Sequence, residues 1–338
     1  MRKINDSEVS IIFDVITMGS NTVDVFAHTE HSQLIDIRSK ERRQEFISYP
    51  VGSKIIINEL LHNFGGNGAN TAVCFSRLGL SAGYLGKVGK DFNGRMIMEN
   101  LRKEKVKFLG ARGAESGFSV VLDAFEEDRT ILTYKGCNSE LKLKEVKTSK
   151  IKAKWLYLSS LLGDSLQTMR TIAASAKEKG VKIAFNPSAT LLENETKTAL
   201  DLVRYADLLV LNKEEAESLV GMNSTEVNIK KLKILGPGMV VITDGKNGAL
   251  AYKDEMYYKV NPLKGLHVVE TTGAGDAFAS TLTAGLMMKK SFDVCLRMAI
   301  NNSEAVISGH GAQTHLLTKK KMLLALAQDK HLIEKRKA

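Results

Sequence analysis

Cysteine is scarce in this sequence. The 338 residues include three cysteines, Cys74, Cys137 and Cys295, which are widely spaced and odd in number. They show neither a CxxC pair nor a Cys/His zinc spacing, so they cannot build a disulfide framework or a structural zinc site. This pattern is typical of a reducing compartment, and we expect a cytoplasmic protein.

Long apolar runs are also missing. The longest uncharged apolar run, Ala277 to Met288, is roughly half the length that a bilayer span requires. The first ten residues carry four charged side chains and no apolar stretch, a composition unlike that of a secretory signal. We therefore expect no membrane partner.

Positive charge is in excess, but it is unevenly distributed. The formal net charge is +10, and residues 317–338 carry seven basic and two acidic side chains. Half of the excess thus lies at the end of the sequence, where Met322, Leu323 and Leu326 fall on one side of a Lys-rich segment. Such a segment is typical of a solvated terminal helix, so we expect no nucleic-acid partner.

The remaining composition, 43% hydrophobic and 25% charged, is that of a globular protein with a sizeable core. Short apolar runs alternate with segments of helical period. We expect buried strands at 11–18, 81–88, 155–159, 181–185, 208–211 and 239–243. We expect helices at 70–78, 93–103, 165–178, 214–220, 274–288 and 292–308. This alternation predicts an α/β sandwich with a mostly parallel central sheet.

Two stretches interrupt the alternation. Residues 25–57 are polar and irregular, whereas 117–134 contain two alternating runs around the turn-like Glu126-Glu127-Asp128, a strong hairpin signal. We interpret 25–57 and 112–138 as β insertions that form a small lid. The main domain then comprises residues 1–24, 58–111 and 139–338.

The most informative segment is Glu270 to Phe278, which reads ETTGAGDAF. Gly273 and Gly275 permit a tight turn into a helix whose first amides point at one spot, where an anion can bind. Asp276 places a proton acceptor beside that spot. The alternative is an ordinary helix start, because a carboxylate in the first turn is stabilised by the helix dipole.

Two further segments suit a polyol ligand. Gly65 to Thr71 reads GGNGANT at the entrance of an expected helix, where Asn67 and Asn70 can exchange hydrogen bonds with hydroxyl groups. A glycine turn with an Asn cap is the alternative. Asp24 follows the first expected strand near its carboxyl end, where open α/β sheets bind ligands, and it could anchor substrate hydroxyls.

Two other strand ends carry polar residues. Asn212 and Glu215 follow the strand at 208–211, and they suit either water-bridged Mg²⁺ or a capping box at a helix start. Residues 243–248 read TDGKNG after the next buried strand and form either a nucleotide loop or only a hairpin. The spacing does not separate these alternatives.

Several catalytic signatures are absent from the sequence. It contains no GxxxxGK[ST] P-loop, no HExxH, no GxSxG and no protein-kinase HRD or DFG motif. The glycines at 65–68 are not a dinucleotide fingerprint, since Thr71 stands where the third glycine would be. These absences argue against P-loop NTPases, zinc proteases, α/β-hydrolases and NAD-dependent oxidoreductases.

Taken together, the segments resemble the ribokinase, or PfkB, family of carbohydrate kinases. GGNGAN at 65–70 resembles the first family signature and TTGAGDAF at 271–278 the second. NKEE at 212–215 is similar to the Asn-x-x-Glu motif of the family, and TDGKNG at 243–248 to its nucleotide loop. The order of these segments agrees from Gly19 to about Gln313. The resemblance implies a ribokinase-like three-layer sandwich with a β lid, and a phosphotransferase that uses ATP and Mg²⁺.

The resemblance also implies roles for individual residues. By it, Asp276 is the general base, and the amides of Gly273, Ala274, Gly275 and Asp276 form an anion hole for the γ-phosphoryl group. The substrate-binding positions are Asp24, Gly66, Asn67 and Asn70. The nucleotide-binding positions are Thr243, Gly245, Gly248 and Asn302. The metal motif comprises Asn212 and Glu215, which bind Mg²⁺ through water.

Three departures from the family pattern bear on specificity. Glu270 stands where potassium-activated members carry Asp, and we expect its longer side chain to displace the carboxylate from the monovalent-cation site. Thr22 replaces an Asn that is common in ribokinases. Asn67 replaces a lysine of many ribokinases and phospho-sugar kinases, which removes one attractive charge for a phosphorylated substrate. We therefore expect neither a strict ribokinase nor a fructose-phosphate kinase.

We accordingly predict a kinase that phosphorylates a hydroxymethyl or other exocyclic hydroxyl of a free sugar or sugar acid. A nucleoside kinase of the same fold is the alternative, and a non-catalytic sugar-binding regulatory relative is the alternative from a different class. The intact segment Gly273 to Asp276 argues against the non-catalytic relative, because a protein that only binds sugar needs no base beside an anion site. We expect the lid to form a homodimer interface.

Overall fold

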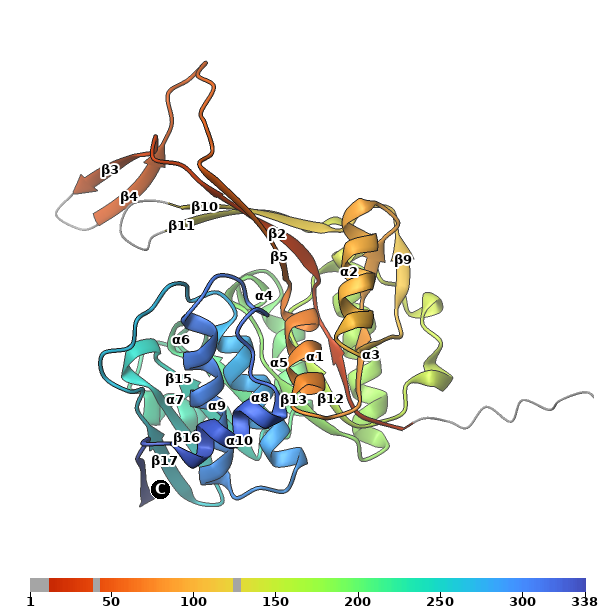
Figure 1. The fold of residues 1–338 in the computed structure, drawn as a ribbon. Coiled ribbons are helices and arrows are strands. Elements are labelled where there is room, and N and C mark those ends of the chain that lie inside the picture. Colours follow the sequence, from red (N-terminus) through yellow and green to blue (C-terminus); the bar gives the residue numbers. More distant parts are fainter. Residues whose placement is uncertain (1–11, 39–42, 124–128) are drawn as a thin grey trace, which may run out of the picture.

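The computed structural model describes residues 12–38, 43–123 and 129–338. Figure 1 shows a body in which helices flank a central sheet, with long strands that project from one end of it. In the described residues the main sheet has ten strands, in the order β18-β17-β16-β15-β14-β13-β12-β1-β6-β8. Neighbours from β15 to β8 pair in parallel, and those from β15 to β18 pair antiparallel. The expected α/β sandwich with a mostly parallel sheet is confirmed.

The central strands are short and apolar, as the sequence predicts. β1, β13 and β14 are buried along most of their length, because helices cover both faces of a parallel sheet. The strands of the main sheet are β1 (Phe13–Met18), β6 (Ala82–Leu85), β8 (Lys107–Phe108), β12 (Ala153–Leu158), β13 (Lys182–Phe185), β14 (Leu208–Asn212), β15 (Met239–Thr243), β16 (Ala249–Lys253), β17 (Met256–Val260) and β18 (Ile333–Lys337).

The single strand expected at 81–88 is wrong, because the chain forms two strands there. β6 ends at Leu85, and β7 (Lys87–Gly89) pairs with β9 (Ala111–Gly113) in a small sheet of its own. The break falls at Gly86, where a Cβ atom would lie 2.2 Å from the hydroxyl oxygen of Tyr84. A glycine inside an apolar run therefore marks a change of direction.

Two groups of helices cover the two faces of the sheet. One face carries α1 (Asn67–Arg77), α2 (Phe92–Lys103), α8 (Ala274–Met287), α9 (Phe292–Ile307) and α10 (Lys319–Ala327). The other carries α3 (Gly163–Glu178), α4 (Ala189–Asn194), α5 (Thr196–Tyr205), α6 (Lys213–Val220) and α7 (Thr225–Ile234). Successive strand residues alternate between the two cores, as Val15 and Ile16 do on β1. Among the described residues, no helix is long and apolar enough to span a bilayer.

The lid is a separate sheet that projects from the body (Figure 1). It contains β2 (Thr22–His28), β5 (Glu59–Gly65), β10 (Gly117–Asp123) and β11 (Arg129–Tyr134), in the order β11-β10-β2-β5. β3 (Gln33–Arg38) and β4 (Arg43–Ser48) form a further hairpin. The expected β lid and its hairpin are confirmed, and the expected turn at 126–128 lies outside the described residues. The sheet starts at Thr22 and includes β5, so its strands extend beyond 25–57 on both sides.

The basic C-terminal segment is only partly the solvated helix that its composition predicts. α10 forms, but Ile333–Lys337 makes up β18, the edge strand of the main sheet, which pairs with β17. Lys335 forms an ion pair with Asp293, and Arg336 forms one with Glu226. A lysine-rich strand suits a sheet edge, because its charge hinders pairing with another chain. Sequence patterns do not separate such a strand from a solvated tail.

Candidate active site

The carboxyl end of β1 packs against the start of α1. Gly19 follows β1 directly, and a Cβ atom at Gly68 would lie 2.6 Å from the backbone of Gly19. Thr17 Oγ1 donates to the Gly68 carbonyl at 2.9 Å, and Asn67 Oδ1 accepts from the Ser20 backbone N–H at 3.0 Å. β1 lies between β6 and β12, where the strand order reverses and where α/β sheets commonly bind ligands.

Asp24 lies on β2 beside the same glycine segment. A Cβ atom at Gly65 would lie 1.8 Å from Asp24 Oδ2, so glycine at this position leaves room for the carboxylate. Asp24 Oδ1 is buried and accepts no hydrogen bond within the described residues. Burial also raises the pKa of this carboxyl. A buried acceptor without a donor is suited to the hydroxyl of a ligand.

The start of α8 is uncapped and has open space beside Gly275. Gly273, the residue before the helix, has a left-handed backbone with φ of 81°, and no side chain caps the helix start. A Cβ atom at Gly275 would meet no described heavy atom outside the helix's own backbone within 4 Å. Uncapped amides that face open space can bind an anion.

Asp276 stands in the first turn of α8 and faces α1. Asn70 Nδ2 donates to Asp276 Oδ2 at 2.9 Å. Burial raises the pKa of Asp276 to about 6, against the lowering effect of the Asn70 hydrogen bond. The pKa of the Tyr157 hydroxyl is raised, mainly by burial and in smaller part by the negative charge of Asp276. The two glycine-rich segments, expected separately as substrate and anion sites, are thus in direct contact.

Two residues that the sequence did not indicate extend this contact. Gln313 Nε2 donates to Asn70 Oδ1 at 2.9 Å, and Asn100 Nδ2 donates to Gln313 Oε1 at 2.9 Å. Asn70 uses its carbonyl for Gln313 and its amide for Asp276, so the orientation of its side chain is determined. No motif or spacing could reveal this chain of amides, since Gln313 and Asn70 are 243 positions apart.

Asn212 and Glu215 form the capping box that the spacing left open as an alternative. Asn212 Oδ1 accepts from the Glu215 N–H at 2.8 Å, and Glu215 Oε2 accepts from the Asn212 N–H at 2.8 Å. Burial raises the pKa of Glu215 to about 7, and the carboxylate of Asp276 adds to the rise. Among the described residues, no group of three His, Cys, Asp or Glu side chains could hold a metal ion directly.

The loop at 243–248 lies beside this capping box. Thr243 on β15 pairs in register with Asn212 on β14. Gly245 and Gly248 have φ values of 48° and 82°, and a Cβ atom at Gly248 would lie 2.0 Å from the Val260 carbonyl oxygen. The segment is the turn of the β15–β16 hairpin, and it also lines an open pocket together with the start of α6.

Asn302 and Glu270 are engaged within the protein. Asn302 is fully buried, its Nδ2 donates to Thr281 Oγ1 at 2.7 Å, and its Oδ1 accepts from the Leu317 N–H at 2.8 Å. These hydrogen bonds join Asn302 on α9 to Thr281 on α8 and to the Leu317 backbone. Glu270 is buried as well, and its Oε2 accepts from the Gly311 N–H at 2.9 Å.

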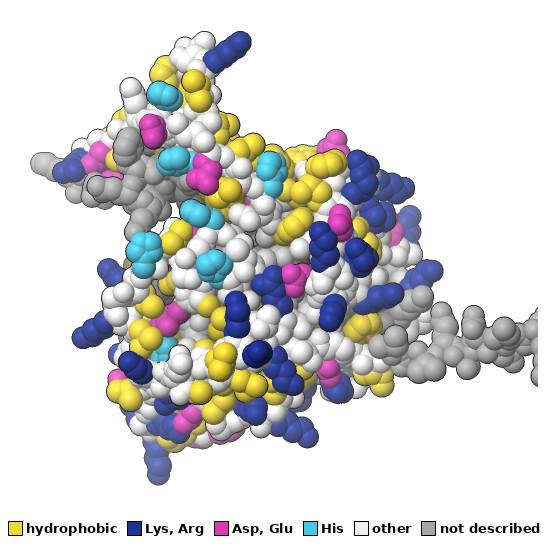
Figure 2. Space-filling view, in the orientation of Figure 1, with side chains coloured by type: hydrophobic (Ala, Val, Ile, Leu, Met, Phe, Trp, Pro, Cys, Tyr) yellow, Lys and Arg dark blue, Asp and Glu magenta, His cyan; other side chains and the backbone are white. Residues whose placement is uncertain are grey.

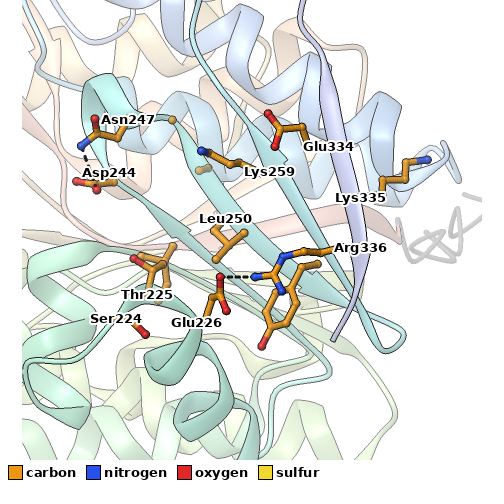
Figure 3. A pocket seen from close by; sticks show the side chains of 14 residues that line it. Ser224, Thr225, Glu226, Asp244, Asn247, Leu250, Lys259, Glu334, Lys335 and Arg336 are labelled. Atoms are coloured by element: carbon orange, nitrogen blue, oxygen red, sulfur yellow. Dashed lines mark hydrogen bonds and ion pairs between the residues drawn. The ribbon is translucent and has the colours of Figure 1, made fainter.

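A hollow of about 430 Å³ lies behind the same loop, between α7 and strands β16 to β18 (Figure 3). Its charged lining residues balance in sign: Lys259, Lys335 and Arg336 against Glu226, Asp244 and Glu334. Two of them are joined by the ion pair of Arg336 and Glu226 (Figure 3). On the face shown in Figure 2, basic side chains are spread over the body with acidic ones among them. Neither feature forms a basic groove of the kind that nucleic acids require.

The fold and these residues define a class of site: in an α/β sandwich, a carboxylate in the first turn of an uncapped helix meets the glycine-rich start of a second helix. The family model for pfkB family carbohydrate kinases matches residues 22–319. The chain therefore belongs to the PfkB family of carbohydrate kinases, phosphotransferases with an alcohol group as acceptor.

Individual relatives agree with this assignment. The chain is 29% identical over 253 residues to ribokinase of Lactococcus lactis, covering 74% of this chain and 81% of that protein. It is 27% identical over 343 residues to 5-dehydro-2-deoxygluconokinase of Shouchella clausii, covering 95% and 97%. The solved structure of Arabidopsis thaliana ribokinase complexed with ribose and ATP matches with a TM-score of 0.76 at 22% identity, over 94% of this chain and 99% of that chain. The expected ribokinase-like fold is confirmed.

Proposed function

We propose that this chain transfers the γ-phosphoryl group of ATP to an exocyclic hydroxyl of a free sugar or sugar acid, with Asp276 as general base. The position of Asp276 carries the proposal. One of its oxygens accepts from Asn70, and the residue stands beside the open space at Gly275. The acceptor hydroxyl must lose its proton as its oxygen bonds to phosphorus, and a carboxylate at this place can take that proton.

The sugar is proposed to bind between the lid and the start of α1. Asp24 offers a buried carboxylate oxygen with no donor among the described residues, and Asn67 lines a pocket together with Ser20. Gly66, at φ of 86°, opens α1 and lets the backbone come close to a ligand. Asn70 would then position both the base and the sugar, because it lies one turn along the helix from Asn67.

The nucleotide is proposed to lie across the ends of β14 and β15, with its γ-phosphoryl group at the amides of Gly273 to Asp276. Thr243, Gly245 and Gly248 shape the loop beside it, and the register of β14 with β15 supports this place. The Arabidopsis ribokinase structure contains ATP with ribose, which supports ATP as the phosphoryl donor. We do not include Asn302, because its polar atoms are engaged in the core.

Mg²⁺ bound to ATP would neutralise charge on the phosphate oxygens during transfer. Asn212 and Glu215 fit such an ion through bridging water molecules, because their side-chain oxygens already accept hydrogen bonds from each other's backbone. Mg²⁺ in proteins usually keeps several of its water ligands. The Glu270 carboxylate accepts a hydrogen bond from the Gly311 N–H, which engages the oxygen that a monovalent cation would need. We therefore propose that activity does not require potassium.

We propose that two copies pair through the lid. The β3–β4 hairpin and the lid sheet expose large apolar side chains: Ile37 on β3 is 54% exposed, Phe46 on β4 46% and Leu132 on β11 56%. A protein surface with several such residues in neighbouring strands is typical of an interaction site. Sedimentation velocity should show a dimer for the wild type and a monomer for Ile37→Glu, and a monomeric wild type would contradict the pairing.

The variant Asp276→Asn tests the kinase proposal, because it retains the shape of the side chain and removes the proton acceptor. We expect kcat to fall at least ~10²-fold while the KM for sugar stays within a few-fold. The assay is ADP release over pentoses, hexoses, 2-keto-3-deoxy sugar acids and nucleosides, with and without potassium. Near-normal turnover would show that another group is the base, and activity with nucleosides alone would overturn the sugar assignment.

A further inference from the structure

A pocket beside Asn67 contains one charged side chain. Ser20 and Asn67 line it from the β1–α1 side, Ser160 and Ser188 from the ends of β12 and β13, and Lys135 from the lid side. The other described lining residues are hydroxyl, amide and leucine side chains, and none of them is a carboxylate. The pocket therefore has a local positive charge that no lining residue neutralises.

Lys135 is held at the edge of this pocket by the fold. It follows the last residue of β11 and precedes the short 3-10 turn at Gly136–Ser139. Its side chain is exposed, and it forms no ion pair with any carboxylate of the described residues. A lysine without a carboxylate partner leaves the three N–H donors of its ammonium group available to a ligand.

Hydroxyl groups complete the lining around Lys135. Ser139 and Ser188 both line the pocket. Ser160 lines it too, and its Oγ is buried with no hydrogen-bond partner among the described residues. One cation together with several hydroxyl donors, and no negative lining group, is the donor set that binds an anion through charge-assisted hydrogen bonds.

We propose that the acceptor substrate carries an anionic group, a carboxylate or a phosphate monoester, which binds Lys135 in this pocket. The inference rests on the proposed function: a carboxylate would select the sugar acids within it, and a phosphate monoester would extend it to phosphorylated sugars, against the expectation drawn from Asn67. The pocket shares Asn67 with the proposed sugar site, and Asn70, one turn further along α1, contacts Asp276. In this proposal the acceptor extends from the pocket past Asn67 and Asn70, with its anionic group at Lys135 and its hydroxyl at Asp276. Many family members carry a lysine at the position of Asn67. In this chain Lys135 of the lid would supply the positive charge.

The experiment compares the wild type with Lys135→Met, which removes the charge, and Lys135→Arg, which retains it. Lys144→Met is the matched control, because Lys144 is an exposed lysine like Lys135 but does not line the pocket. The acceptors are 2-keto-3-deoxygluconate for the carboxylate, fructose 6-phosphate for the phosphate, and fructose and ribose as neutral sugars. Initial rates of ADP release give KM and kcat for each pair of variant and acceptor.

We expect one of the anionic acceptors to have the highest kcat/KM, and Lys135→Met to raise its KM about tenfold or more with little change in kcat. Lys135→Arg should restore the affinity in part, and neutral sugars should be unaffected. The preferred anion identifies the group as carboxylate or phosphate. Preference for a neutral sugar, or a KM for the anionic acceptor that Lys135→Met changes less than about twofold, would overturn the inference.

Calorimetric binding of the same compounds separates this inference from the kinase proposal. If no acceptor is phosphorylated but an anionic one binds in a Lys135-dependent manner, the anion site stands and the proposed reaction is wrong. If sugars are phosphorylated and anion binding does not depend on Lys135, the reaction stands and the anion site is wrong. If the chain neither binds nor phosphorylates these compounds, both proposals are overturned.

Discussion

Asn70 Nδ2 lies 2.9 Å from Asp276 Oδ2, although 206 positions separate the two residues. The hydrogen bond joins the glycine-rich start of α1 to the glycine-rich start of α8. Gln313 determines which atom of the Asn70 side chain faces Asp276, because Gln313 Nε2 donates to the Asn70 carbonyl oxygen and leaves the amide nitrogen for Asp276. The orientation of the proposed base therefore depends on residues outside its own motif.

The raised pKa of Asp276 predicts an acid limb in the pH profile. Burial brings this pKa to about 6. A general base must be deprotonated to work, so kcat/KM should be level above the pKa and fall about tenfold per pH unit below it. Steady-state rates between roughly pH 5 and 8 at saturating nucleotide measure this limb. A profile that stays level to pH 5 would assign the proton to another group.

Gln313→Leu should change the orientation and the pKa of Asp276, although Gln313 bonds to Asn70 and not to Asp276 itself. Loss of the Nε2 donor lets the Asn70 amide rotate, which turns its carbonyl toward Asp276 and disfavours the charged carboxylate. We expect kcat to fall about tenfold with a smaller change in sugar KM, and the acid limb to move to higher pH. Glu99→Gln on the exposed side of α2 is the control. A lower melting temperature with an unmoved acid limb would leave Gln313 a structural role only.

Gly275→Ala should separate folding from catalysis. A Cβ atom at this position meets no described atom outside the helix's own backbone within 4 Å, so stability should be retained or slightly increased. The methyl group would occupy the space proposed for the γ-phosphoryl group, and kcat/KM should fall at least ~10²-fold.

Two other glycines serve as comparisons for this substitution. At Gly238 a Cβ atom would be in ordinary contact, 3.7 Å from the Asp207 carbonyl oxygen, so Gly238→Ala should leave activity unchanged. At Gly273 the backbone has φ of 81° and a Cβ atom would lie 2.4 Å from Ala312 Cβ, so Gly273→Ala should lower the melting temperature. Wild-type activity of Gly275→Ala would place the phosphoryl group elsewhere.

His331 predicts a pH dependence of stability that is unrelated to catalysis. It is 2% exposed and lies two positions before β18, and its ring contacts Asp329 and Glu304. Arg297 and Asn301 also bond to Asp329. Burial alone lowers the pKa of His331, but hydrogen bonds to Glu304 and Asp329 outweigh it, and the pKa is raised above 6.5.

The charged imidazole therefore stabilises the folded chain, fully below the unfolded pKa near 6.5 and progressively less as the pH rises through the raised folded value. His331→Gln should lower the free energy of unfolding by ~1–3 kcal/mol at about pH 6, and the difference from wild type should shrink by about pH 9. Urea denaturation at the two pH values measures it, with the exposed His62→Gln as control. A difference independent of pH would show that the ring acts through packing alone.

Much of the fold could be predicted from local patterns. The strands at 208–211 and 239–243 and the helices at 93–103 and 292–308 match β14, β15, α2 and α9 closely, because apolar periodicity reports burial directly. β18 could not be predicted, since its basic residues give no apolar alternation and its pairing with β17 is long-range. Gly86, which ends β6, was hidden inside an apolar run.

Residue type and local spacing were enough to predict the family, the order of the elements and the place of Gly273 to Asp276 at a helix start. Which polar groups meet became clear from the three-dimensional structure. It joined Gln313 to Asn70, closed Asn212 and Glu215 into a capping box, and buried Asn302 in the core. It also brought Lys135 and Asn67 to the lining of one pocket. Contacts of this kind arise from the packing of distant elements, and no local pattern in the chain encodes them.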